Sequence, residues 1–317
     1  MNRLMNFVVY GLRDINLPNS IRTIEAKAFL NCTGFKTFTI PDSIDKIGDE
    51  AFSGCTNLTE IIIPENIKSI GVGVFGNCPN LKHINIPENF STLWVGAFWG
   101  CTNYTDIDLP KRITRISNSA YRNSSLKKAT IPDWITEIGE SAFQNCTELT
   151  DVTIPNSIKH IGAYAFQNCK SLKRIILPNS ITEIEWNTFM GCESLTDITL
   201  PDSIKNISVN AFSYCTNLTN VTLPNGIQNI ASESFIDCTN LKHINIPESV
   251  TSIGPDAFRS CSSLESITIP SSVEIIDDCA FCGCNNLNVI IDNEEGKVQL
   301  GEEEFPFEGC KSVKYLR

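Results

Sequence analysis

Residues 41–63 read PDSIDKIGDEAFSGCTNLTEIII, and this stretch recurs with small changes along most of the 317-residue chain. The proline that opens it returns every 23 residues, with one step of 22 between Pro110 and Pro132. An aromatic residue keeps the same spacing from Phe29 onward, and a cysteine usually follows three residues later. A period of this length is typical of a solenoid, in which each copy is one coil that stacks only on its neighbours.

The letters of one coil predict its local structure. Before Pro64, apolar residues two apart predict a short strand with one face inward, which ends at the proline because proline has no N–H to donate. The P-x-S-I segment is typical of a turn, and Gly48 lets the chain bend. The A-F-x-x-C segment is too short for a regular helix and predicts a single helical or 3-10 turn that buries Phe52 and Cys55.

This repeat resembles the BspA-like, or Treponema-type, leucine-rich repeat, whose unit reads roughly C-x-x-L-x-x-I-x-I-P-x-S-I-x-x-I-G-x-x-A-F-x-x. The resemblance runs from about Leu12 to Leu287. It implies a leucine-rich repeat solenoid with a parallel β-sheet on the concave face and short strand, turn and 3-10 segments on the convex side. It also implies a surface role in adhesion to host or matrix proteins, without catalysis.

We expect a single leucine-rich repeat domain over 1–317, because a solenoid grows in length without a second core. Residues 1–11 are predicted to cap the first coil, 12–287 to form about twelve repeats, and 288–317 to cap the last. A signal peptide is the competing interpretation of the first residues, but Asn6 interrupts the apolar run there. Near the other end, D-N-E-E-G between apolar runs predicts a hairpin.

Charge and hydropathy restrict the partners. The formal net charge is −11, without a block of Lys and Arg, which argues against nucleic acid and anionic membranes. The chain has no run of eighteen apolar residues, so neither a transmembrane helix nor membrane insertion is predicted. We therefore expect a monomer that binds a neutral or basic protein. Its location stays open, since the resemblance implies the cell surface and the missing signal peptide favours the cytoplasm.

The chain contains 14 cysteines, and most of them form a ladder with one cysteine per coil. Stacked coils would place the Cβ atoms about 4.8 Å apart, beyond the ~3.8 Å of a disulfide, so free buried thiols are expected. Cys279 and Cys282 fall at variable positions and are expected as surface thiols. With Cys284 they spell C-x-x-C-x-C, for which a metal site near Cys310 is the alternative. The ladder comprises Cys32, Cys55, Cys78, Cys101, Cys146, Cys169, Cys192, Cys215, Cys238, Cys261 and Cys284.

A run of departures from the repeat marks one candidate binding surface. Trp94 replaces the repeat glycine, Trp99 follows Phe98, and Trp134 replaces the turn serine. In the same region Ser124 replaces the ladder cysteine and one residue is lost. Either large residues fill the core around this deletion, or the three tryptophans are exposed and anchor a protein partner, as tryptophan often does in interfaces.

The predicted concave strands supply a second candidate surface. The residue before the central apolar residue of each strand is polar in most coils, and its charge alternates from Asp106 to Asp197. Opposite charges on neighbouring strands support one another, so a self-neutralising ladder competes with a polar protein-binding surface. The partner-binding candidates of this surface are His83, Asp106, Lys128, Asp151, Arg174 and Asp197.

The sequence motifs that could indicate a catalytic or cofactor site in this chain are all incomplete. The G-x-G-x-x-G at Gly71, Gly73 and Gly76 lacks the following helix of a dinucleotide site. His83 and His243 stand seven coils apart and cannot share a metal, and His160 is expected on the other side of the coil. A pair of carboxylates on neighbouring coils is expected to have nothing nearby that raises the pKa of either one. We therefore predict no catalytic residue, metal or cofactor. The predicted function is a non-catalytic protein-protein interaction module. The resemblance implies a surface adhesion or recognition protein of the BspA-like type, and an intracellular leucine-rich repeat scaffold is the alternative.

Overall fold

The computed structural model describes residues 3–4, 12–13, 15–303 and 305–316. Two compact units, Met1–Leu149 and Thr150–Arg317, are each a parallel β-solenoid, and the described residues contain strands and turns without a helix. Most of the predicted cap at 1–11 lies outside the described residues, although β1 (Arg3–Leu4) pairs in parallel with β2 (Thr23–Ile24). Nowhere in the described part of the chain does a helix long and apolar enough to cross a membrane occur.

A regular coil carries two strands, which we call the face strand and the side strand. The face strand follows C-x-x-L, and the side strand follows P-x-S-I. In the first unit the face strands are β3 (Thr37–Thr39), β5 (Glu60–Ile62), β7 (His83–Ile84) and β9 (Lys128–Thr130). Its side strands are β2, β4 (Lys46–Ile47), β6 (Ser69–Ile70), β8 (Arg115–Ile116) and β10 (Glu137–Ile138).

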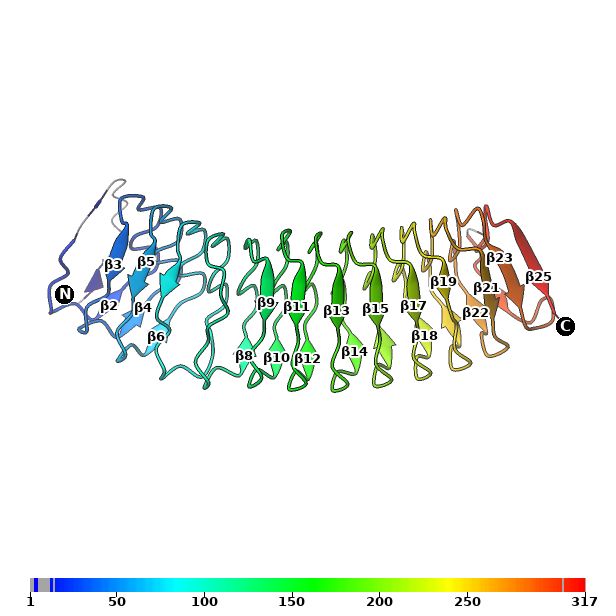
Figure 1. The fold of residues 1–317 in the computed structure, drawn as a ribbon, viewed down its shortest axis with the longest axis horizontal. Helices are drawn as coiled ribbons and strands as arrows, with labels where there is room; N and C mark the ends of the chain where they lie inside the picture. The colour runs from blue at the N-terminus through cyan, green and yellow to red at the C-terminus, as the bar shows by residue number, and fades with distance from the viewer. Residues whose placement is uncertain (1–2, 5–11, 14, 304, 317) are drawn as a thin grey trace. The chain divides into compact units, whose positions relative to one another are not determined.

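The second unit continues the same pattern, and its successive face strands lie side by side in Figure 1. The face strands are β11 (Asp151–Thr153), β13 (Arg174–Ile176), β15 (Asp197–Thr199), β17 (Asn220–Thr222), β19 (His243–Ile244), β21 (Ser266–Ile269), β23 (Asn288–Ile291) and β25 (Ser312–Tyr315). The side strands are β12 (His160–Ile161), β14 (Glu183–Ile184), β16 (Asn206–Ile207), β18 (Asn229–Ile230), β20 (Ser252–Ile253), β22 (Ile275–Ile276) and β24 (Gln299–Leu300).

Each three-residue face strand buries its central residue and exposes the residues on either side. In β15, Ile198 is buried whereas Asp197 and Thr199 are exposed, and the same order recurs in β3, β5 and β13. This alternation is the two-residue period of a strand with one face on the core. The predicted parallel sheet is therefore confirmed within each unit.

The A-F-x-x-C segment differs from the expected helical turn. The Cys55 N–H donates to the Phe52 carbonyl at 3.2 Å, but the Phe52 N–H donates to the next coil, at Val74. Glu50 and Gly54 on either side of Phe52 have positive φ angles of 54° and 73°. Because alternate N–H groups leave the segment to bond the next coil, it forms linked turns instead of a 3-10 helix.

Stacked aromatic rings fill the core of each unit. In the second unit, rings from Phe166 to Phe307 follow one another at centroid distances between 5.1 and 5.7 Å. Ladder thiols lie beside them, and those from Cys192 to Cys284 donate to the phenylalanine carbonyl of the preceding coil, as Cys215 does to Phe189 at 3.2 Å. All eleven ladder cysteines are buried and none of them forms a disulfide, so this prediction is confirmed.

The hairpin expected near the C-terminus is wrong. Strand β23 pairs in parallel with β21 and β25, whereas β24 pairs in parallel with β22. The D-N-E-E-G segment thus connects a face strand to a side strand, as the prolines do elsewhere. Phe307 stacks on Phe281 and continues the core into this last part of the chain.

Candidate protein-binding surface

The outward side chains of the face strands form what we call the strand face. In the second unit, Asp151 pairs in register with Arg174, and Arg174 with Asp197. All three are exposed. In the first unit, His83 is exposed opposite Glu60, and Lys128 is exposed on β9. The sequence therefore correctly predicted that these five candidates are exposed on face strands.

The charges of the strand face do not neutralise one another through ion pairs. Among the described residues, Arg174 takes part in none within 4.0 Å, although acidic residues flank it. The Asp151 carboxylate accepts a hydrogen bond from the Thr150 hydroxyl at 2.8 Å, and Asp197 accepts one from Thr196 at 3.0 Å. The self-neutralising ladder is thus not built as direct pairs, and the charged groups keep their exposure to solvent.

Large apolar side chains interrupt the polar strand face at two places. Ile176, at the end of β13, is 80% exposed, and Ile62, at the end of β5, is 46% exposed. Most other coils place threonine or asparagine at this position, for example Thr199 beside Ile176. An isoleucine at an outward position adds nothing to the core, although a single exposed apolar residue is not by itself a sign of a partner.

Asp106 does not lie on a strand, contrary to expectation. The chain forms none over 105–109, where Tyr104 replaces the leucine of the repeat and stacks on Phe98 at 4.2 Å. Asp106 nevertheless lines two open hollows, one with His83 and one with Lys128. The larger ring at 104 and the residue lost before Leu126 break the local register here, while the polar groups remain close to one another.

Of the two interpretations of the tryptophans, exposure is wrong for Trp94. Its side chain is 6% exposed and packs edge-on against Phe75, at 6.0 Å between ring centroids, and near Phe90 and Phe98. Tyr121 is also fully buried, in the ring stack. The interpretation that large residues fill the core around the shortened coil is confirmed for these two positions.

Trp99 and Trp134 are half-buried. Trp99 covers Gly76, because a Cβ there would lie 3.0 Å from its ring. The Trp134 ring lies 6.0 Å from the Lys111 ammonium. A role of either residue in partner binding stays a prediction. Sequence reasoning missed Trp186, which is 58% exposed at a variable repeat position and is the most exposed tryptophan of the described residues.

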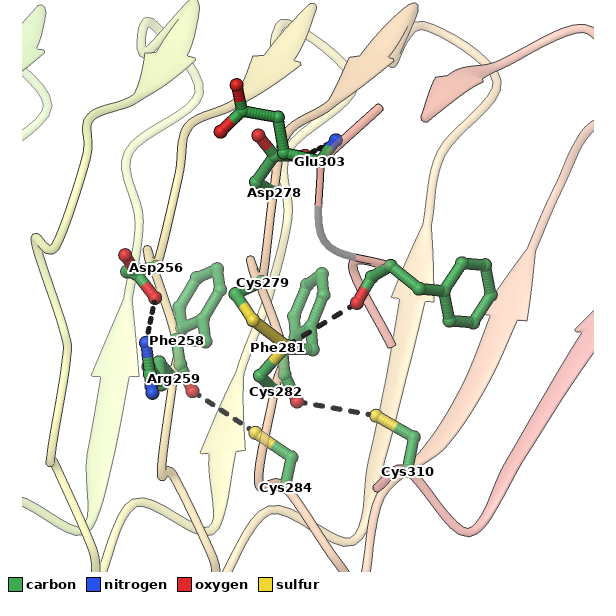
Figure 2. Close-up of a disulfide and its surroundings, with 11 residues drawn as sticks. Asp256, Phe258, Arg259, Asp278, Cys279, Phe281, Cys282, Cys284, Glu303 and Cys310 are labelled. Atoms are coloured by element: carbon green, nitrogen blue, oxygen red, sulfur yellow. Dashed lines mark hydrogen bonds and ion pairs between the residues drawn. A yellow bond between two sulfur atoms is a disulfide. The ribbon is translucent and has the colours of Figure 1, made fainter. Parts of the chain in front are cut away.

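The expectation of surface thiols at Cys279 and Cys282 is wrong, since the two form a disulfide and both are buried (Figure 2). They occupy the positions two before and one after Phe281. In the preceding coil the same positions hold Asp256 and Arg259, which form an ion pair at 3.1 Å. The side chains at these two positions therefore meet in both coils, and between Cys279 and Cys282 the contact is covalent.

Removing the disulfide should destabilise the second unit moderately. Cys279→Ser combined with Cys282→Ser is expected to lower the unfolding free energy by about 2 kcal/mol, because the bridge closes a loop of only a few residues. Urea unfolding with and without dithiothreitol measures the effect. The reductant should lower the midpoint of the natural chain and leave that of the double variant unchanged. A double variant as stable as the natural chain would contradict the bond's contribution.

The metal alternative rested on these two cysteines with Cys284 and Cys310, but the carboxylate that lies close to the two sulfur atoms is that of Glu308, and Cys310 donates to the Phe281 carbonyl at 3.5 Å. In the disulfide neither sulfur is a thiolate, and thiolates are what zinc requires of cysteine. Cys284 points away from them and donates to the Phe258 carbonyl at 3.1 Å (Figure 2). The C-x-x-C-x-C motif thus divides into a disulfide and a core thiol.

The expectation that nothing raises the pKa of a carboxylate is wrong near His160. This histidine lies with Glu183 and Glu185 in a half-buried cluster whose ligand atoms are all within 4.8 Å of one another. Burial, followed by the charge of Glu183, raises the pKa of Glu185, while His160 lowers it. The signal was available in the sequence, because Glu185 replaces the repeat glycine and Glu183 stands 23 residues after His160.

Comparison with known families matches the whole repeat array. The model of the BspA type leucine rich repeat region matches in six copies, over residues 6–125, 95–218 and 182–314. The comparison with curated proteins gives no match.

Solved structures show the same architecture. A leucine-rich repeat protein from Bacteroides ovatus is 29% identical, with a TM-score of 0.73 over 100% of this chain and 82% of the other. A leucine rich cell surface protein from Faecalibacterium prausnitzii is 26% identical, with a TM-score of 0.53 over 88% and 79%. The pneumococcal vaccine antigen PcpA, 19% identical with a TM-score of 0.59 over 90% and 78%, shares the fold.

Proposed function

Because the chain belongs to the BspA-type leucine-rich repeat family, we propose that it is a non-catalytic recognition protein that binds a host or matrix protein through its strand face. The observation that carries this proposal is the combination on β13 of an unpaired exposed Arg174 with Ile176, which is 80% exposed. Arginine and a large apolar side chain side by side are the kind of residues on which interfaces depend.

Two further features support a partner outside the cell. The net charge of −11 favours a neutral or basic partner through its long-range field. The Cys279–Cys282 disulfide suits an oxidising compartment, where such bonds persist. A similar solved protein, that of Faecalibacterium prausnitzii, is described as a cell surface protein.

Protease treatment of intact source cells tests the location. If the chain is displayed on the surface, its fragments are released while cytosolic control proteins stay protected. Release only after lysis would contradict surface recognition and would favour the alternative, an intracellular scaffold, whose partner a pull-down would then identify.

Two substitutions on β13 test the binding surface against a panel of immobilised extracellular-matrix proteins. Arg174→Ala is expected to weaken the interaction by about 2 kcal/mol, or roughly 30-fold, as for an interface hot spot. Ile176→Thr, which installs the residue that neighbouring coils carry, should weaken it as well while leaving the unfolding midpoint unchanged.

Lys205→Ala is the matched control, because it removes an exposed positive charge away from the face strands. Surface plasmon resonance with each variant measures the loss. If Lys205→Ala weakens binding as much as Arg174→Ala does, binding follows overall charge and the strand face is not the site.

A further inference from the structure

The cluster of His160, Glu183 and Glu185 lies on neighbouring coils of the second unit. His160 begins β12 and Glu183 begins β14, one repeat later. Glu185 follows Glu183 by two residues, so both carboxylates project to the same side of the extended chain. One imidazole nitrogen and two carboxylate oxygens thereby come within 4.8 Å of one another.

Glu185 stands at a position that the fold usually reserves for glycine. At Gly48 and Gly71 an added Cβ would lie 2.3 and 2.4 Å from a backbone nitrogen of the preceding coil. Coils with glycine there keep their side strands paired, as β4 pairs with β2 and β6 with β4. Ser208 shows that a small side chain is tolerated, since its N–H still donates to Ile184 at 2.9 Å.

At Glu185 this pairing is interrupted. Strand β14 pairs with β16, and among the described residues it is not paired with β12. A carboxylate therefore lies at a break in the side-strand ladder. The residue at the glycine position does not by itself set the pairing, because in the described part of the chain β18 is not paired with β16 where Ala231 stands, whereas β22 pairs with β20 where Asp277 stands.

The donor set suits one class of ion. One imidazole with two carboxylates is a ligand set that zinc accepts, whereas calcium and magnesium prefer oxygen alone. Zinc bonds of about 2.0 to 2.1 Å require ligand atoms roughly 3.3 Å apart in a tetrahedron, so the three half-buried side chains need only modest rotation to close on the ion. The backbone N–H of Trp186 favours the ionised form of Glu185 and lowers its pKa, against the larger effect of burial, which raises it.

We propose that His160, Glu183 and Glu185 form a zinc-binding site that ties the coil of β12 to the coil of β14 where the side-strand ladder is broken. Water completes the coordination of the ion, since only three protein groups converge. The site is independent of the strand face, because its residues lie on side strands.

Titration of the metal-free protein with zinc, by calorimetry, tests the proposal. We expect one ion per chain and a rise in the unfolding temperature of the natural protein, because an ion that binds only the folded state stabilises it. Trp186, exposed and next to Glu185, provides a second signal through its fluorescence.

Variants chosen from the repeat itself keep the fold intact. Glu185→Gly restores the repeat glycine, and His160→Asn places the residue that Asn206 supplies at the same position two coils later. Each should weaken zinc binding at least about 10-fold, the loss that removing an outer-shell partner of a ligand already brings. Both should also abolish the zinc-dependent rise in unfolding temperature.

His243→Asn is the matched control, since it removes a histidine of the strand face. His243→Asn is expected to keep zinc binding, whereas Glu185→Gly and His160→Asn are expected to lose it. Zinc-soaked crystals of the natural protein should show an anomalous diffraction peak between His160 and Glu185. Absence of binding by the natural protein, or equal binding by all three variants, would overturn the site.

Discussion

Replacing Phe212 by alanine is expected to lower the unfolding free energy of the second unit by about 3 to 5 kcal/mol. The ring is fully buried and stacks between Phe189 and Phe235, at 5.5 and 5.4 Å between centroids. Neighbouring coils hold the backbone through hydrogen bonds on both sides, as at Phe212 N–H to Ser234, so the cavity cannot collapse easily.

The same substitution should also divide the unfolding transition. Coils in a solenoid interact only with their neighbours, so a weakened contact near the middle of an array lets the two parts unfold at different urea concentrations. Hydrogen exchange along a urea titration measures this by residue. Protection should be lost first on one side of Phe212.

Phe305→Ala is the control for ring removal, because Phe305 is 56% exposed and lies outside the stack. Its cost should stay below about 1 kcal/mol. A loss of similar size in both variants, or a single unchanged transition in Phe212→Ala, would contradict the role of the stack.

The spacing of Pro, Phe and Cys predicts the solenoid because each of these residues has one task per coil. Proline ends a face strand, phenylalanine enters the ring stack, and the thiol bonds the carbonyl behind it, as Cys238 does with Phe212 at 3.2 Å. Since every coil repeats these tasks, period alone was enough to assign strands such as β15 and the buried ladder. The period could not distinguish linked turns from a 3-10 turn, because that difference depends on hydrogen bonds to the next coil.

The candidate sites were harder to predict because they depend on departures from the repeat. Trp94 at a glycine position appeared exposed from its place in the repeat, yet the neighbouring coil has room for it beside Phe75. Cys279 and Cys282 appeared to be separate surface thiols, because sequence does not show that the side chains at these two positions meet. The sequence shows that Glu185 departs from the glycine of the repeat, but its closeness to His160 depends on how two coils stack.

Alkaline pH is expected to destabilise the solenoid through its buried thiols. Burial raises the pKa of Cys78, Cys192 and Cys284 to about 12 and that of Cys146 to about 11, from the ordinary thiol value of 9.0. Above pH 9 the thiols of the unfolded chain lose their protons while those of the folded chain keep them. The unfolded state then binds fewer protons, so the unfolding free energy falls by about 1.4 kcal/mol per pH unit for each such thiol, up to the folded-state pKa.

Cys192→Ser isolates the share of one thiol. Serine keeps a donor for the Phe166 carbonyl, which Cys192 bonds at 3.2 Å, and the buried Ser124 shows that a coil accepts serine at this position. The variant starts less stable at pH 7, but its deficit should shrink by about 2 kcal/mol between pH 7 and about 10.5, because serine does not titrate there. Urea unfolding at several pH values measures the deficit. A deficit that stays constant with pH would mean that Cys192 ionises as readily in the folded chain as in the unfolded one, and the buried ladder would then not be the cause of alkaline unfolding.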